Sequence, residues 1–109
     1  MTHYDADEIV PPGQPQKRVM MGRVSQIHRP DRTAEAGDNF EINGATYEIT
    51  DVTERPLSEI TVSDARKEAA RSMMQFRQRI QSVDPDFEWT DGNTLVRYQF
   101  RRQLPSDED

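Results

Sequence analysis

The sequence predicts an α+β fold, a small β-barrel with one long amphipathic helix packed beside it. Three observations support this fold class: an Asn-Gly pair between two alternating segments, a helical apolar pattern from Ala65 to Val83, and renewed alternation from Leu95 to Arg102. One long helix and several short strands share a single core most readily when a curved sheet wraps around that core. The 109 residues have room for one such core.

Residues 37–52 predict a β-hairpin whose two-residue loop is Asn43-Gly44. A type I′ turn requires positive φ at both central residues, which Asn and Gly tolerate. In this register Phe40 faces Tyr47, and the large apolar side chains share one side of the ribbon. A shift by one residue would mix apolar and polar side chains, so the register is well specified. The polar side chains fall on the other side: Glu41, Thr46 and Glu48.

Two segments are predicted before the hairpin. Residues 1–16 contain three prolines and little that could pack, so we expect a flexible N-terminal arm. Residues 17–29 carry several apolar residues and predict the first strand, within which Gly22 marks a bulge or a close backbone approach. Pro30 ends this strand, and a polar loop leads into the hairpin.

After the hairpin, Thr61 and Asp64 have the spacing of a capping box at a helix start. The apolar residues that follow recur every three or four positions and predict a single helix of about 20 residues. Pro85 ends that helix, and residues 84–94 form an acidic loop around Trp89. The stripe consists of Ala65, Ala69, Met73, Phe76, Ile80 and Val83.

The last strand, residues 95–102, has two distinct faces. The apolar face carries Val96, Tyr98 and Phe100, and the polar face carries Arg97, Gln99 and Arg101. The expected domain therefore spans residues 17–103, and an acidic C-terminal tail occupies residues 104–109.

Charge and composition exclude several classes of protein. The net charge of −6 resides in the two ends of the chain, so the body is balanced and is compatible with a basic surface. The twelve Arg and two Lys residues suit bidentate contacts, although such a ratio also accompanies a GC-rich genome or a high-salt habitat. There is no Cys and there are only two His, so we expect no metal site and no cofactor. No segment resembles a signal peptide or a membrane span, which predicts a cytoplasmic protein without a membrane partner.

Two catalytic or metal-binding patterns fail on spacing. The alternating carboxylates of residues 84–88 resemble a calcium loop, but Trp89 and Leu95 stand where Gly and Glu are required. Ser25 and His28 are three positions apart, which places them on opposite faces of a strand.

Basic residues surround both the first and the last predicted strands. If these strands adjoin, Arg23 and Arg29 would join the Arg row of the last strand in a surface suited to phosphates, with Trp89 at its flank as a stacking platform. The plainer alternative is a solvent-facing Arg row paired with nearby acids. Tyr98 points away from that row and is expected in the core. The remaining basic residues of this group are Lys17, Arg18, Arg32, Arg101 and Arg102.

Four segments, in their order and spacing, resemble the ASCH domain, a family of the PUA-like superfamily. They are residues 22–29, the hairpin beginning at Gly37-Asp38, the helical segment 64–68 and the strand ending at Phe100. The resemblance covers roughly residues 18–102, and its details are similar to versions from halophilic archaea. It implies a PUA-like β-barrel with a helix beside a cleft, and a role in binding RNA or modified nucleotides.

Some members of this family are hydrolases, and a bacterial subgroup uses a lysine, a threonine and a glutamate on acylated cytidines. Gly22 and Arg29 match the family's first-strand pattern, and Glu68 matches its glutamate. Val24 and Ile27 occupy the positions of the lysine and of the acidic residue or threonine. Neither side chain can activate a nucleophile or carry a proton, so we expect the lysine-dependent amidohydrolase chemistry to be absent. Ala69 stands where a glycine is common.

The leading hypothesis is an RNA- or nucleotide-binding domain with a cleft between barrel and helix, into which Arg29 and Glu68 both point. One alternative is a hydrolase of a modified nucleoside or RNA with Glu68 as base. Another is an interaction module that uses the acidic termini. The oligomeric state and the ligand stay open. The candidate ligand-binding residues are Arg23, Ser25, Arg29, Glu68, Ser72, Trp89, Arg97 and Tyr98.

Overall fold

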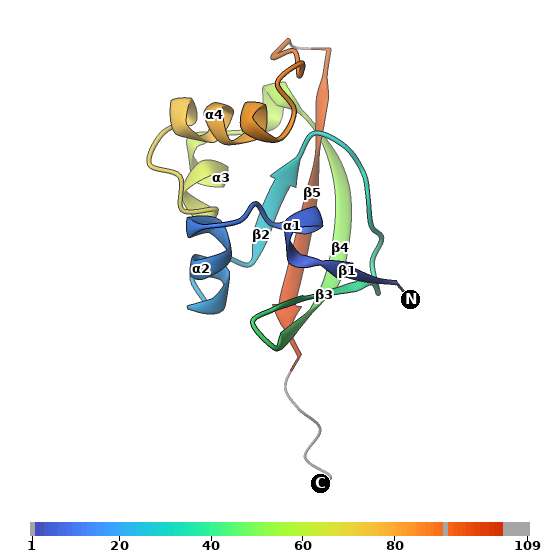
Figure 1. The fold of residues 1–109 in the computed structure, drawn as a ribbon. Helices are drawn as coiled ribbons and strands as arrows, with labels where there is room; N and C mark the ends of the chain where they lie inside the picture. The colour runs from blue at the N-terminus through green and yellow to red at the C-terminus, as the bar shows by residue number, and fades with distance from the viewer. Residues whose placement is uncertain (1, 91, 104–109) are drawn as a thin grey trace, which may run out of the picture.

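The structure, a computed structural model, describes residues 2–90 and 92–103 of the chain. In chain order the elements are β1 (His3–Asp5), α1 (Ala6–Ile9), α2 (Gln14–Met20), β2 (Gln26–Arg29), β3 (Asn39–Ile42), β4 (Ala45–Pro56), the 3-10 turn η1 (Leu57–Glu59), α3 (Val62–Lys67), α4 (Met73–Val83) and β5 (Thr94–Arg102). The strands form one sheet in the order β1-β3-β4-β5-β2. The helices α2, α3 and α4 lie together in a column beside β2 (Figure 1).

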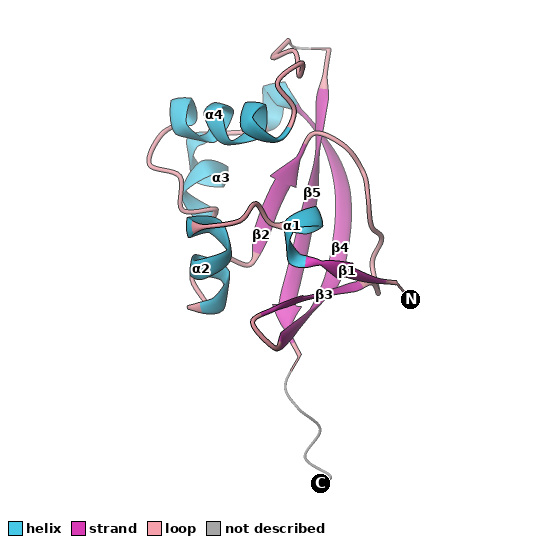
Figure 2. Cartoon of the chain, in the orientation of Figure 1, coloured by secondary structure: helices cyan, strands magenta, loops and turns pink. Residues whose placement is uncertain are grey.

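The α+β class is confirmed, but the prediction of a closed barrel is wrong. Within the described chain, β1 and β2 are the two edges of the sheet and do not pair with each other. The long strand β4 shifts register against β5 between Ile49 and Asp51, an irregularity that bends a sheet without closing it. The result is an open, curved sheet with the helical column at one side (Figure 2).

The hairpin and the last strand are confirmed. β3 and β4 pair with Phe40 opposite Tyr47, and both loop residues have positive φ, 48° at Asn43 and 85° at Gly44. The rings of Phe40 and Tyr47 stack with centroids 5.4 Å apart. In β5 the predicted apolar face is buried: Val96, Tyr98 and Phe100.

The predicted first strand is wrong over most of its length. Residues 14–20 form helix α2, and only Gln26–Arg29 are extended. Gly22 ends this helix instead of forming a bulge: its N–H donates to the carbonyl of Val19, the N–H of Arg23 donates to that of Arg18, and Gly22 has φ 78°. This pair of bonds is the Schellman motif, which favours glycine.

The N-terminal segment was predicted to be a loosely attached arm with little to pack, and this is also wrong. β1 pairs with β3 in parallel, and His3 lies opposite Asn39. Ile9 and Val10 are completely buried in the core formed by the sheet. These two apolar residues anchor a segment whose prolines suggested disorder. The predicted acidic tail, residues 104–109, lies outside the described residues.

The predicted single helix of about 20 residues is two helices, α3 and α4, while its capping box and its end before Pro85 are confirmed. The chain breaks at Ala69, whose φ of 64° is left-handed and costs about 1–2 kcal/mol for a residue with a Cβ. Ser72 starts α4, and its Oγ accepts a hydrogen bond from the N–H of Gln75 at 3.2 Å. Most of the apolar stripe still packs inward, in a second core that includes Ala65, Phe76, Ile80, Phe87 and Leu95, while Ala69 packs against the first core.

Candidate functional site

Glu68 lies at the break between α3 and α4, and its carboxylate hydrogen-bonds to residues of β2. Its side chain is 1% exposed. The carboxylate accepts hydrogen bonds from the Gln26 amide nitrogen at 3.2 Å and from the main-chain N–H of His28 at 3.0 Å, and it also contacts Nδ1 of His28. Both oxygens are therefore engaged inside the protein, and the carboxylate does not face solvent.

Arg29 points away from Glu68, so the predicted shared hollow is wrong. Arg29 lies opposite Val96 of β5, while its neighbour His28 lies opposite Arg97. Successive residues of a strand face opposite sides of the sheet, and Glu68 bonds on the His28 side. Arg29 instead donates from Nη1 to the carbonyl of Ile9 at 3.2 Å. Burial lowers the pKa of Arg29 below its ordinary value, an effect opposed by Asp31, Tyr98 and Glu8.

Two predicted contact residues have structural roles in the described chain. Tyr98 is fully buried, as the core interpretation required, and its hydroxyl accepts hydrogen bonds from the main-chain N–H groups of Thr33 and Ala34. Ser72 caps α4. Tyr98 is therefore closed to a ligand, whereas Ser72 is exposed.

Trp89 packs in the second core. Its ring meets the ring of Phe76 edge-on, with centroids 6.2 Å apart. The guanidinium carbon of Arg77 lies over the Trp89 ring, 4.9 Å from its centroid. Because this cation occupies a face of the indole, Trp89 does not present that face for stacking on a base.

β2 and β5 do adjoin, which was the condition for a basic surface across them. However, Arg97 lies 4.0 Å from Asp51 and Arg101 lies 3.3 Å from Glu48, both acids of β4. The polar face of β5 therefore fits the plainer alternative of an Arg row paired with acids. Arg23 and Ser25 are both exposed and lie in the connection between α2 and β2.

A polar hollow of about 200 Å³ lies between α2 and the start of α4. Three arginines from three segments line it: Arg18 of α2, Arg71 of the connection between α3 and α4, and Arg79 of α4. Nη1 of Arg79 donates to the carbonyl of Glu68 at 2.8 Å, which fixes this arginine in place. No carboxylate lines the hollow; its other lining residues are Gln14, Pro15, Ala69 and Gln75.

Arg18 and Arg79 lie close enough to repel each other. Burial lowers the pKa of Arg79, the Glu68 carboxylate opposes that shift, and neighbouring Arg18 lowers the pKa further. None of the three arginines forms a salt bridge within residues 2–90 and 92–103. The Glu68 carboxylate offsets part of the charge of Arg79, but no carboxylate lines the hollow, which therefore keeps a net positive charge. An anion placed there would relieve this repulsion.

The hollow lies within a basic side of the molecule. Residues 14–25 and 62–83, which include α2, α3 and α4, carry eight of the 14 basic residues but only two of the 20 acidic ones, Asp64 and Glu68. Both of these acids are buried, and Asp64 forms a salt bridge with Arg55 at 2.8 Å. We call this group of segments the basic helical layer. The other residues are strongly acidic, with 18 acidic and six basic side chains.

Three residues of this site were absent from the predicted set. Arg18 falls in the predicted first strand, and Arg71 and Arg79 fall in the predicted single helix, outside its apolar stripe. The signal that reveals them is the scarcity of acids in residues 14–25 and 62–83, which is visible only after these segments are grouped in space.

The described residues contain no cluster of three or more His, Asp or Glu side chains that could hold a metal ion. No helix within these residues is long and apolar enough to cross a membrane.

The fold is similar to that of a solved ASCH domain. The crystal structure of an ASCH domain from Lactobacillus crispatus JV V101 superposes with a TM-score of 0.63 and 12% identity, covering 80% of this chain and 69% of that one. A protein of Enterococcus faecalis V583 that carries the family designation DUF984 superposes with a TM-score of 0.57 and 18% identity, covering 79% of this chain and 64% of that one. At these identities the similarity shows the fold alone. No protein-family model and no curated protein matches the sequence.

Proposed function

We propose that this protein binds RNA through its basic helical layer, with the hollow of Arg18, Arg71 and Arg79 holding a backbone phosphate. The observation that carries the proposal is the hollow itself: three arginines without a carboxylate partner, two of which repel each other. Guanidinium groups bind phosphate oxygens through paired, charge-assisted hydrogen bonds. The ASCH-like fold is compatible with the RNA-binding role that the sequence resemblance implies.

The size of the hollow favours a phosphate of a polymer over a whole enclosed nucleotide. At about 200 Å³ it is smaller than the roughly 300–1,000 Å³ typical of sites that enclose a small molecule. The surrounding layer supplies further cations for neighbouring phosphates, namely Lys17, Arg23, Arg66 and Lys67. A single strand crossing α2 and α4 would meet several of these charges.

The direct test measures binding of a short single-stranded RNA of mixed sequence by fluorescence anisotropy over a series of salt concentrations. Each phosphate contact contributes about 0.7 to the slope of log affinity against log salt. Arg71→Gln should weaken binding and reduce this slope by about that amount. The matched control is Arg32→Gln, an exposed arginine outside the basic helical layer, which should leave the slope unchanged. Equal effects of the two variants would refute the proposed site.

The hydrolase alternative finds no comparable support, because the Glu68 carboxylate is 1% exposed and already accepts two hydrogen bonds. The hydrolase alternative is tested by measuring product release from a panel of modified nucleosides, with the Glu68→Gln variant as control. Deleting residues 104–109 and changing the exposed Asp7 and Glu8 to Asn and Gln tests the alternative of a protein-interaction module, since these changes keep the buried Ile9 and Val10 and RNA binding should survive them.

A further inference from the structure

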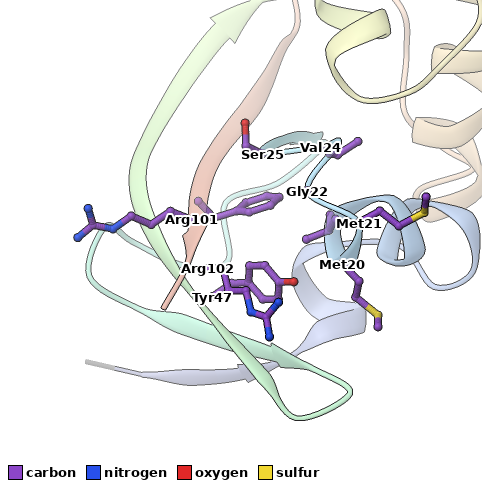
Figure 3. Close-up of a pocket in the computed structure, with 10 residues that line it drawn as sticks. Met20, Met21, Gly22, Val24, Ser25, Tyr47, Arg101 and Arg102 are labelled. Atoms are coloured by element: carbon purple, nitrogen blue, oxygen red, sulfur yellow. The ribbon is translucent and has the colours of Figure 1, made fainter. Parts of the chain in front are cut away.

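A second hollow, of about 320 Å³, lies on another side of α2, between that helix and the ends of β4 and β5 (Figure 3). It shares no lining residue with the arginine hollow. Its volume reaches the lower end of the range for sites that enclose small molecules. We call it the Met–Tyr hollow, after Met20, Met21 and Tyr47, which line it.

The Met–Tyr hollow is apolar on its floor and on one rim. Val19, Val24 and Phe100 are buried below it. Met20 is 39% exposed and Met21 57% exposed. In the part of the chain that the structure describes, four large apolar side chains are exposed, and these two are side by side at the hollow. Exposed apolar side chains next to a concave surface are typical of a binding site.

The opposite wall carries the hydroxyl of the buried Tyr47 and the guanidinium of the exposed Arg102. Tyr47 lies directly opposite Arg102 in the β4–β5 pairing, so both side chains lie on the same face of the sheet. Within the described residues, the Tyr47 hydroxyl makes no hydrogen bond and Arg102 makes no salt bridge. The adjacent Arg101 also lines the hollow, but its side chain pairs with Glu48 on the other face and points away (Figure 3).

Met20 lies on the rim of the Met–Tyr hollow and contacts the hairpin loop. Nδ2 of Asn43 donates to the Met20 sulfur at 3.5 Å. This contact joins α2 to the turn between β3 and β4, so the two sides of the hollow are connected.

We propose that the Met–Tyr hollow binds a small aromatic carboxylate. The ring would pack against Phe100 and the methionines, whose polarisable sulfur atoms favour aromatic contacts. The carboxylate would receive hydrogen bonds from the Arg102 guanidinium and the Tyr47 hydroxyl. The hollow offers one cation and one hydroxyl beside an apolar surface, which matches a ligand with one anionic group attached to a flat aromatic ring. This proposal does not depend on the RNA-binding proposal.

The test uses naphthalene-2-carboxylate as the probe, with the neutral naphthalene-2-carboxamide as its matched control. Isothermal titration calorimetry should give a Kd of about 1 mM or lower for the carboxylate, the range expected of an aromatic probe of this size. The carboxamide should bind at least a few-fold more weakly. In protein with isotope-labelled methionine methyl groups, the NMR signals of Met20 and Met21 should move, and those of Met73 and Met74 should not.

Two variants separate charge recognition from general attraction. Arg102→Gln should weaken carboxylate binding about five- to tenfold and leave carboxamide binding unchanged. Arg101→Gln, the neighbouring residue that points away, should have no effect, and neither should Arg71→Gln in the arginine hollow. Tyr47→Phe, which keeps the ring, should weaken carboxylate binding by a smaller factor.

Several outcomes would overturn the proposal. They are absence of carboxylate binding, equal affinity for the carboxamide, equal losses from Arg101→Gln and Arg102→Gln, or movement of the Met73 and Met74 signals instead. The loss of RNA binding in Arg71→Gln leaves this inference untouched, so the two proposals fail separately.

Discussion

Replacing Glu68 by Ala should destabilise the protein strongly, because the buried Glu68 carboxylate hydrogen-bonds the break between α3 and α4 to β2. The substitution removes the acceptor of the Gln26 amide and of the main-chain N–H of His28, both in a buried setting. Each buried donor left without a partner costs about 1–3 kcal/mol. Two such donors together suggest a loss of about 3–5 kcal/mol, a large part of the roughly 5–15 kcal/mol that stabilises a typical domain.

Urea unfolding followed by Trp89 fluorescence measures this loss, since Trp89 packs against Phe76 and Phe87 in the second core. The matched control is Glu59→Ala, an exposed glutamate, which should change the free energy of unfolding by less than about 0.5 kcal/mol. A Glu68→Ala protein as stable as the control would show that the hydrogen bonds of this carboxylate do not stabilise the fold. That result would reopen its assignment as a catalytic base.

Two further predictions concern backbone strain and acid stability. Ala69→Gly should raise the free energy of unfolding by about 0.5–1 kcal/mol, because glycine adopts the left-handed φ at this position without steric cost; thermal melts check this, and a lower melting temperature would contradict it. Hydrogen bonds from the main-chain N–H groups of Glu35 and Thr2 lower the pKa of Asp38. The stabilisation from Asp38 is therefore complete above its ordinary pKa and is lost as pH falls through the lowered value. Asp38→Asn should flatten the pH dependence of unfolding between about pH 5 and pH 2, and an unchanged profile would contradict this.

The features that the sequence predicted correctly are those specified by neighbouring residues. The Asn43-Gly44 turn, the Thr61–Asp64 capping box and the alternation of β5 each depend on side chains a few positions apart. The apolar run at Val19, Met20 and Met21 was ambiguous, because a short run of this kind suits a strand or a helix equally well. The Schellman bonds at Gly22 then resolved it in favour of the helix.

The features that the sequence missed depend on contacts between distant residues. The β1 edge of the open sheet forms when His3 pairs with Asn39, which no local pattern indicates. The apolar stripe ran smoothly through Ala69, but Glu68 turns inward to bond with β2, and the helix breaks there. The arginine hollow was missed for the same reason, because Arg18 of α2 and Arg79 of α4 come together only in the folded chain.

The most direct test of the RNA-binding site is the salt dependence of RNA affinity in a protein with Arg18, Arg71 and Arg79 all changed to Gln. Loss of contacts from all three arginines should lower the slope of log affinity against log salt by about 2, while circular dichroism shows an unchanged fold. A folded triple variant that binds RNA with the slope and affinity of the wild-type protein would contradict the proposed phosphate site.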